Sequence, residues 1–273
     1  MKETDTDAKK PRPFLKWAGG KRQLLRELLQ YRPKKWGCYH EPFVGGGAVF
    51  FDLRPERAVL CDSNKELIDC YIAVRDQVDK VIHALKKHHH DKEYYYQIRE
   101  QNPDKLNPAT RAARMIYLNK TGFNGLYRVN SKNFFNVPFG RYVNPTICDE
   151  SNLRACSAAL QHIDILCSPF ENVLKRARAG DFVYFDPPYV PLSFTSSFTS
   201  YTEGKFSMED QTLLRDVAVK LKNRGVFVLL SNSSAPAVME LYSKGFELIP
   251  VSATRLVNSK AKGRGKITEL LIR

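Results

Sequence analysis

The sequence predicts an α/β protein with an open, mostly parallel sheet and one inserted domain of a different kind. Short apolar segments bounded by turn residues, typical of buried parallel strands, recur at residues 38–40, 58–61, 163–167, 182–185, 226–230, 246–251 and 268–272. Helix-like segments lie between them at residues 47–53, 208–223 and 236–243. This alternation stops between residues 71 and 144, where we place the insert.

The helix-like segments carry start signals and apolar repeats. Ser207 stands as an N-cap before residues 208–223, and Asp210 follows three residues later, which approximates a capping box. Residues 22–31 show a further helical pattern behind a pair of glycines. Alternation of strands with such helices predicts a sheet covered by helices on both faces.

Residues 71–144 form the predicted insert, and residues 1–70 and 145–273 form the main domain. The first part of the insert is polar and helical. Its last part, residues 119–142, is dense in Asn, Gly and aromatic residues, which is typical of a hairpin or loop excursion.

Composition excludes several classes of protein. The chain has 273 residues, of which 43% are hydrophobic, enough for one large core with a smaller attached domain. No apolar run approaches the roughly 20 residues that a membrane-spanning helix needs. Residues 1–10 are polar, unlike a signal peptide. The six cysteines show no zinc-binding spacing, so we expect reduced thiols, no metal and a cytoplasmic location.

A run of three histidines, His88 to His90, has two interpretations. Metal binding is one of them. The other is a solvated helix end, because Lys86, Lys87, Asp91 and Lys92 flank the run. We favour the solvated helix end, since short motif matches are weak evidence for a site.

The charge distribution favours a nucleic-acid partner. The net charge is +14 and the pI is near 9.5. Two stretches lack Asp and Glu, residues 105–148 and residues 248–268. Their basic residues are Lys105, Arg111, Arg114, Lys120, Arg128, Lys132 and Arg141 in the first stretch, and Arg255, Lys260, Lys262, Arg264 and Lys266 in the second. A basic run can also be only a solvated face. Two acid-free runs, one of them rich in aromatics, favour a surface for DNA.

A glycine turn follows the first predicted strand, at residues 41–47. Its spacing differs from the G-x-G-x-x-G of dinucleotide folds, but glycines still let a ligand approach the backbone. Asp62 ends the next predicted strand, where a carboxylate can accept hydrogen bonds from both ribose hydroxyls. A tight turn alone would explain the glycines. Together with Asp62 they favour a cofactor that contains a nucleoside.

The segment Asp186-Pro187-Pro188-Tyr189 comes directly after the predicted strand at residues 182–185. An aromatic amine is a poor nucleophile because its lone pair is delocalised into the ring. A carboxylate and a backbone carbonyl can hold the two N–H groups and turn that lone pair towards an acceptor. Asp186 supplies the carboxylate, Pro187 a carbonyl of fixed direction, and Tyr189 a flat face for a base.

A third cluster lies near the N-terminus, at residues 14–21. Lys21 follows a glycine pair at the predicted start of a helix, where the helix dipole and the ammonium together favour a bound carboxylate. Trp17, in the same cluster, would more often be a core residue.

These clusters, in this order and separated by an insert, resemble the Dam-type (D12 class, α-group) DNA adenine-N6 methyltransferases. The resemblance covers residues 14–53, 119–142 and 181–273, and residues 71–110 lie outside it. It implies a Rossmann-like S-adenosylmethionine-dependent methyltransferase sheet, with a mainly helical DNA-recognition insert that carries a β-hairpin. The implied catalytic residues are Asp186, Pro187 and Tyr189. The implied cofactor residues are Trp17, Lys21, Phe43, Gly45, Gly47, Asp62, Phe170 and Asp186.

Residues 121–128 and 136–142 look like the recognition hairpin of Dam-type enzymes that act at GATC. The resemblance implies DNA contacts at Lys16, Lys120, Phe123, Asn124, Leu126, Arg128, Pro138 and Tyr142. In that family the aromatic at Phe123 inserts into the double helix beside a flipped base. One departure is Tyr127, where a family member has a smaller residue, so contacts near this position are in doubt.

The expected reaction is direct transfer of a methyl group from S-adenosylmethionine to N6 of a flipped adenine in duplex DNA, by a monomer and without a metal. Similar loops also serve methyltransferases that act on RNA or on protein amides, so this alternative stays open. A DNA-binding module without catalysis is disfavoured by the complete Asp186–Tyr189 segment. A nicotinamide oxidoreductase is disfavoured by the glycine spacing.

Overall fold

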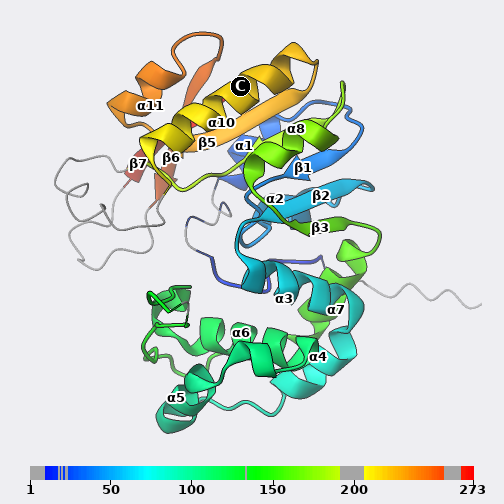
Figure 1. The fold of residues 1–273 in the computed structure, drawn as a ribbon, viewed down its shortest axis with the longest axis vertical. Helices are drawn as coiled ribbons and strands as arrows, with labels where there is room; N and C mark the ends of the chain where they lie inside the picture. The colour runs from blue at the N-terminus through cyan, green and yellow to red at the C-terminus, as the bar shows by residue number, and fades with distance from the viewer. Residues whose placement is uncertain are drawn as a thin grey trace, which may run out of the picture. The chain divides into compact units, whose positions relative to one another are not determined.

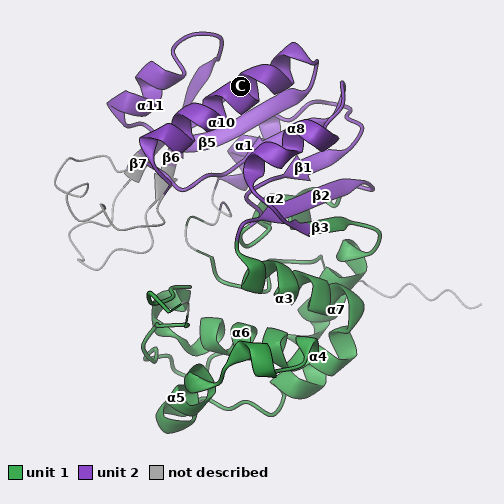
Figure 2. Cartoon of the chain, in the orientation of Figure 1, with its two compact units in different colours: residues 1–20, 45–54, 64–165 green, residues 21–44, 55–63, 166–273 purple. Residues whose placement is uncertain are grey.

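The computed structural model of the chain describes residues 10–17, 19, 21, 24–132, 134–190, 206–254 and 266–273. Contacts divide the chain into two compact units (Figure 2). Unit 1 consists of residues 1–20, 45–54 and 64–165, and unit 2 of residues 21–44, 55–63 and 166–273. Unit 1 thus holds the predicted insert, residues 71–144, together with further segments. The narrower boundary for the insert stays a proposal.

A seven-stranded sheet runs in the order β3-β2-β1-β4-β5-β7-β6 (Figure 1). The strands are β1 (Tyr39–Glu41), β2 (Ala58–Asp62), β3 (Asp164–Cys167), β4 (Phe182–Phe185), β5 (Phe227–Ser233), β6 (Leu248–Thr254) and β7 (Lys266–Ile272). Strand β1 pairs in parallel with β2 and β4, and β4 pairs in parallel with β5. Strand β7 is antiparallel to both β5 and β6. The mostly parallel sheet is therefore confirmed, and its antiparallel edge is an addition.

Apolar side chains of β4 and β5 form the core of unit 2 with helices on one face of the sheet. The helices are α8 (Val173–Arg176), α10 (Met208–Asn223) and α11 (Pro236–Leu241), and unit 2 also contains α1 (Leu25–Gln30). Leu214, Val217 and Leu221 of α10 are buried in this core. Ser207 and Asp210 form the predicted capping box, which satisfies backbone N–H groups at the start of α10.

Unit 1 is helical. It contains α2 (Ala48–Leu53), α3 (Lys65–Asp76), α4 (Val78–Leu85), α5 (Lys92–Glu100), the short turn η2 (Pro103–Lys105), α6 (Pro108–Thr121) and α7 (Glu150–Leu160). Arg114 of α6 is 1% exposed, so its charge requires partners. It donates to the carbonyls of Ile98 and Arg99 and pairs with Glu66 at 3.3 Å. This contact joins α6 to α5 and α3.

The hairpin predicted at residues 119–142 forms only in part. Residues up to Thr121 belong to α6, and a short turn η3 (Phe123–Gly125) follows. Antiparallel pairing appears as two isolated bridges, Gly122 with Phe139 and Val129 with Phe135, rather than as strands. Asn124 has φ of 54°, which bends the chain out of the extended conformation, and Pro138 has no N–H to donate. We call residues 122–142 the recognition excursion.

No helix among the described residues is long and apolar enough to cross a membrane.

Candidate active site

The segment Asp186–Tyr189, which we call the 186–189 loop, follows the carboxyl end of β4. Strand β1 lies between β2 and β4, so the strand order reverses at this point of the sheet. Open α/β sheets bind ligands outside the carboxyl ends of their strands at such a reversal. The fold therefore places the predicted catalytic residues at the edge of the sheet where a ligand site is expected.

Asp186 forms an ion pair with Lys21 inside unit 2. Lys21 Nζ lies 2.8 Å from Asp186 Oδ1, and the Lys21 side chain is only 4% exposed. Burial raises the pKa of Asp186 above its ordinary value, and the neighbouring ammonium opposes that shift. The ion pair therefore favours the ionised carboxylate, which can only accept hydrogen bonds.

Lys21 also lies 4.4 Å from the centre of the Tyr189 ring. We expected this ammonium at a helix N-terminus, facing the carboxylate of a ligand. In the structure α1 begins at Leu25, and Lys21 contacts two side chains of the 186–189 loop; its contact with a ligand carboxylate stays a prediction. The sequence did not predict the contact with the loop, because more than 160 residues separate Lys21 from the loop.

Glu269 of β7 is a part of the site that sequence reasoning missed. The Tyr189 hydroxyl donates a hydrogen bond of 2.8 Å to Glu269 Oε2. Burial raises the pKa of Tyr189 well above its ordinary value, so the hydroxyl stays protonated and keeps this bond. No local motif marks Glu269; the pairing of β7 with β5 brings it to the site.

Three residues predicted to bind a cofactor follow neighbouring strands of the sheet. Phe43 comes after β1, Asp62 ends β2, and Phe170 comes after β3. The rings of Phe43 and Phe170 stack with their centres 5.2 Å apart, and Phe206 packs against both. A carboxylate and aromatic faces that follow neighbouring strands suit the ribose and the base of a nucleoside, so these residue types fit the cofactor that the sequence predicts.

The remaining predicted cofactor residues, Trp17, Gly45 and Gly47, belong to unit 1. Gly45 and Gly47 have φ of 46° and 66°, in the left-handed region that favours glycine. A Cβ on Gly45 would lie 2.7 Å from Trp17 Cδ1, and one on Gly47 would lie 2.7 Å from the Tyr71 hydroxyl. Aromatic side chains of the same unit thus lie against these glycines, and the contact of Trp17 with a cofactor stays a prediction.

Tyr127, where the sequence departs from the family pattern, packs into unit 1. Its ring stacks on Trp17 with centres 5.3 Å apart, and its hydroxyl donates to Glu66 Oε2 at 2.8 Å. The larger side chain therefore packs the recognition excursion against Trp17.

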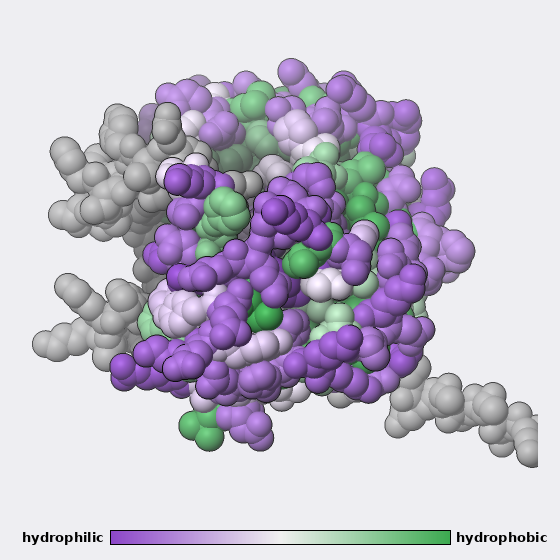
Figure 3. All heavy atoms as spheres, turned by 60° about the horizontal axis from the view of Figure 1, so that its bottom comes forward, coloured by the Kyte–Doolittle hydropathy of each residue, from purple (hydrophilic) through white to green (hydrophobic). Residues whose placement is uncertain are grey.

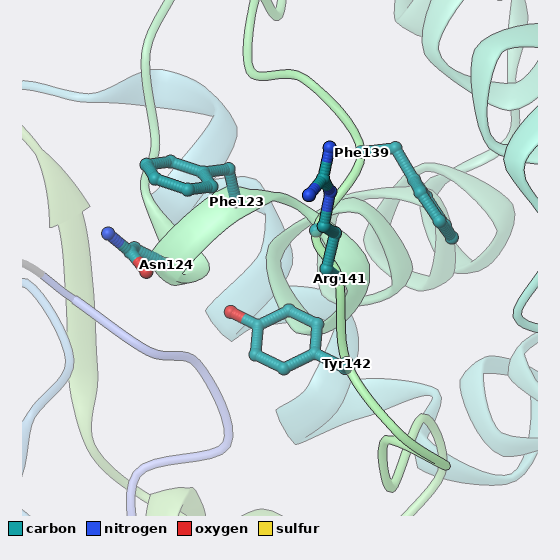
Figure 4. Close-up of a pocket in the computed structure, with 6 residues that line it drawn as sticks. Phe123, Asn124, Phe139, Arg141 and Tyr142 are labelled. Carbon is teal, nitrogen blue, oxygen red and sulfur yellow. The ribbon is translucent and has the colours of Figure 1, made fainter.

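A pocket of about 420 Å³ opens on the recognition excursion (Figure 4). Its lining brings together three residues predicted to contact DNA, Phe123, Asn124 and Tyr142, and adds Phe139, Gly140 and Arg141. Lys16 Nζ lies 4.0 Å above the Tyr142 ring, and Asn119 Oδ1 accepts a hydrogen bond from the Lys16 backbone N–H. The structure thus gathers Lys16, Phe123, Asn124 and Tyr142 in one region.

The other predicted DNA contacts lie on the surface of unit 1. Arg128 is exposed, and its Nε and Nη2 donate to the Asn136 carbonyl at 3.2 and 2.6 Å. Leu126 is half-buried, Pro138 is exposed, and Lys120 is half-buried in the last turn of α6. Figure 3 shows a mostly hydrophilic face on which apolar side chains are scattered. The predicted basic residues Arg255, Lys260, Lys262 and Arg264 lie outside the described residues, as does the side chain of Lys266.

The histidine run is not a solvated helix end, and for His88 and His90 that prediction was wrong. It lies between α4 and α5, where His88 stacks on Tyr117 with ring centres 4.6 Å apart and His90 stacks on Phe139 at 4.7 Å. Burial lowers the pKa of His88 to about 4. His90 supports a wall of the pocket, since Phe139 lines it. Within the described part of the chain, no group of His, Cys, Asp and Glu could hold a metal ion.

Comparison with known proteins gives consistent matches along the chain. Residues 17–257 match the sequence model of the D12 class N6 adenine-specific DNA methyltransferases. The chain is 50% identical to the type II methyltransferase M1.LlaDCHI of Lactococcus lactis subsp. cremoris, over 96% of this chain and 94% of that protein. It is 44% identical to the type II methyltransferase M.MjaIII of Methanocaldococcus jannaschii, over 96% and 98%. It is 38% identical to the DNA adenine methylase of Escherichia coli K12, over 96% and 95%.

Proposed function

The chain belongs to the D12 class N6 adenine-specific DNA methyltransferases, and on that premise we propose that it methylates N6 of adenine at GATC sites of duplex DNA. It does so as a monomer, with S-adenosylmethionine as the donor. The observation that carries this proposal is the 186–189 loop, in which a buried Lys21 holds the Asp186 carboxylate beside the Tyr189 ring.

The 186–189 loop supplies what methylation of an aromatic amine requires. Asp186 Oδ atoms and the Pro187 carbonyl accept the two N–H groups of N6, which turns the nitrogen lone pair out of conjugation. Tyr189 offers a face on which the base stacks, and its hydroxyl is fixed by Glu269. Catalysis by these residues rests on position and on charge.

The residues proposed to bind S-adenosylmethionine include those at the ends of β1, β2 and β3. Asp62 accepts hydrogen bonds from the ribose hydroxyls, and Phe43 and Phe170 face the adenine of the cofactor. Trp17, Gly45, Gly47 and Lys21 complete the proposed set. S-adenosylmethionine supplies a methyl group on a sulfonium, a donor that is already activated.

Duplex DNA binds at the recognition excursion and the basic residues around it. N6 of a stacked adenine cannot meet a bulky donor, so the base must leave the helix. In this proposal the exposed ring of Phe123 fills the gap in the stack, and Arg128 contacts a guanine edge in the major groove. The name DNA adenine methylase of one relative supports DNA as the substrate.

Transfer of tritium from labelled S-adenosylmethionine tests the proposal against its alternatives. We expect label in duplex DNA that contains GATC, and not in RNA or in protein. Label in RNA or protein with none in DNA would overturn the proposed substrate. If the protein binds S-adenosylmethionine but labels neither DNA, RNA nor protein, it is a binding module without catalysis.

A further inference from the structure

Buried side chains from α10 and β5 donate hydrogen bonds to the 186–189 loop and to the residue after it. Gln211 and Asn232 are 0% exposed and Ser233 is 5% exposed. Gln211 Nε2 donates to the Pro188 carbonyl at 3.0 Å, and Ser233 Oγ donates to the Val190 carbonyl at 2.7 Å. These two hydrogen bonds therefore hold the backbone immediately before and immediately after Tyr189.

Asn232 fixes the orientation of the Gln211 amide. Asn232 Nδ2 donates to Gln211 Oε1 at 3.0 Å, and Asn232 Oδ1 accepts from the Ser233 backbone N–H at 2.8 Å. Each amide oxygen thus accepts and each amide nitrogen donates within one directed series. Reversing any amide would place two donors or two acceptors together, which is expensive in a buried site.

Tyr189 is held at a third point, because its hydroxyl donates to Glu269 Oε2 at 2.8 Å. Two backbone carbonyls and one hydroxyl determine both the path of the chain through Tyr189 and the plane of its ring. Gln211 does not belong to any motif of the loop and is separated from Pro188 by 23 positions in the sequence.

We propose that Gln211, held by Asn232, is a positioning residue for methyl transfer. It fixes the Tyr189 ring and the Pro187 carbonyl in the geometry that the target amine requires. This inference rests on the proposed function. Gln211 acts through the loop and does not touch the base.

The test compares two substitutions at Gln211 in the full chain. Gln211→Met keeps the length of the side chain but removes both hydrogen bonds. Gln211→Glu keeps the shape, and its carboxyl can donate to the Pro188 carbonyl only while it is protonated. Burial raises the pKa of such a carboxyl, so the donor is present at low pH and is lost as pH rises.

A matched control lies at the other end of β4. Asp181, just before the strand, accepts hydrogen bonds from the Cys38 and Arg178 backbone N–H groups and pairs with His40 at 3.1 Å. Asp181→Asn perturbs a buried hydrogen-bond network of the same unit without contacting the loop. Thermal unfolding and circular dichroism compare the stability of all the variants.

The protein is first bound to duplex DNA and S-adenosylmethionine, and the rate of a single turnover is then measured. The dissociation constants for DNA and for S-adenosylmethionine are measured separately. We expect Gln211→Met to slow this rate about 10- to 100-fold, the effect of a small misplacement, with both dissociation constants within about twofold of wild type. The rate of Gln211→Glu relative to wild type should fall about tenfold or more from pH 6 to pH 9. Asp181→Asn should keep the wild-type rate.

An unchanged rate for Gln211→Met, an equal loss for Asp181→Asn, or a Gln211→Glu ratio independent of pH would each overturn the inference. Failure of the proposed function is a separate outcome, because wild-type protein would then transfer no methyl group to DNA.

Discussion

At the residue scale, the charge of Asp186 is set by two opposed influences. Burial raises the pKa of its carboxyl, and the Lys21 ammonium at 2.8 Å lowers it. The ionised carboxylate accepts hydrogen bonds at both oxygens, whereas the protonated form presents an O–H donor at one of them. Lys21 thus favours the charged form of the carboxylate that the proposed mechanism uses.

Replacing Lys21 with Met should narrow the pH range of activity. Without the ammonium the pKa of Asp186 rises, so the rate is lost at a higher pH as the solution is acidified. Single-turnover rates measured against pH at saturating cofactor give the position of this acidic limb. Coincident limbs for Lys21→Met and wild type would contradict the assigned role of the ion pair.

Asp62→Ala tests the proposed cofactor site and also serves as a control for the pH profile. It should weaken binding of S-adenosylmethionine by about 1–3 kcal/mol, the penalty for a lost charge-assisted hydrogen bond, and leave the acidic limb in place. Isothermal titration gives the affinity. Unchanged affinity for both variants would remove Lys21 and Asp62 from the proposed cofactor site.

The sequence located the 186–189 loop because its four residues are contiguous and follow an apolar strand. It did not locate Glu269 or Gln211, because their bonds to the loop span 80 and 23 positions and depend on how β7 and α10 pack. Short motifs can be recognised in a sequence, whereas buried partners from distant elements cannot.

At the element scale, apolar periodicity was a good guide to strands and a poor guide to the recognition excursion. Each predicted strand begins within two residues of an observed one, because buried parallel strands are short apolar runs. The excursion depends on the conformation of single residues such as Asn124. The histidine run depends on stacking with Tyr117 and Phe139, which are distant in sequence.

The histidine run should make stability depend on pH. His88 has a pKa of about 4 in the fold against an ordinary value of 6.5, so it is neutral when folded. Between pH 6.5 and pH 4, His88 binds a proton in the unfolded chain but not in the folded chain. The free energy of unfolding therefore falls as pH drops from 6.5 to 4. His88→Phe keeps a ring beside Tyr117 and should reduce this fall. Urea unfolding at pH 7.5 and pH 5 measures it, and equal falls in both proteins would refute the account.

The recognition excursion carries the prediction on sequence choice. If Arg128 donates two hydrogen bonds to O6 and N7 of a guanine, Arg128→Ala should lose about 1–3 kcal/mol of discrimination between guanine and other bases at one position of GATC. The structure also shows the competing role, since Arg128 donates twice to the Asn136 carbonyl. Values of kcat/KM on GATC and on singly substituted sites distinguish the two roles. A uniform loss over every site would leave Arg128 as a local support of the excursion.

Lys120→Ala is the control for this experiment. As a phosphate contact, Lys120 should strengthen binding to all sequences alike, and its loss should lower the salt slope by about one. A change in preference among sites for Lys120→Ala would contradict that role.

At the scale of the whole molecule, the net charge of +14 favours a polyanionic partner, and the sheet topology favours a ligand site at the carboxyl ends of the strands. The alternation of strands and helices predicted a parallel sheet, and the reversal between β1 and β4 locates the candidate site at its edge. The antiparallel insertion of β7 between β5 and β6 could not be predicted, because periodicity gives the face of a strand and not its neighbours.

Quantification of N6-methyladenine in plasmid DNA tests the central claim most directly. Plasmid from a strain that lacks adenine methylation is incubated with S-adenosylmethionine and either wild-type protein or Asp186→Ala, then digested to nucleosides or challenged with nucleases that methylation of GATC blocks. We predict N6-methyladenine and protected GATC sites with wild type. Asp186→Ala should give neither, although it folds and binds DNA, because Asp186 acts on the amine. Methylation by Asp186→Ala within a few-fold of wild type, or no N6-methyladenine from wild-type protein, would contradict the account.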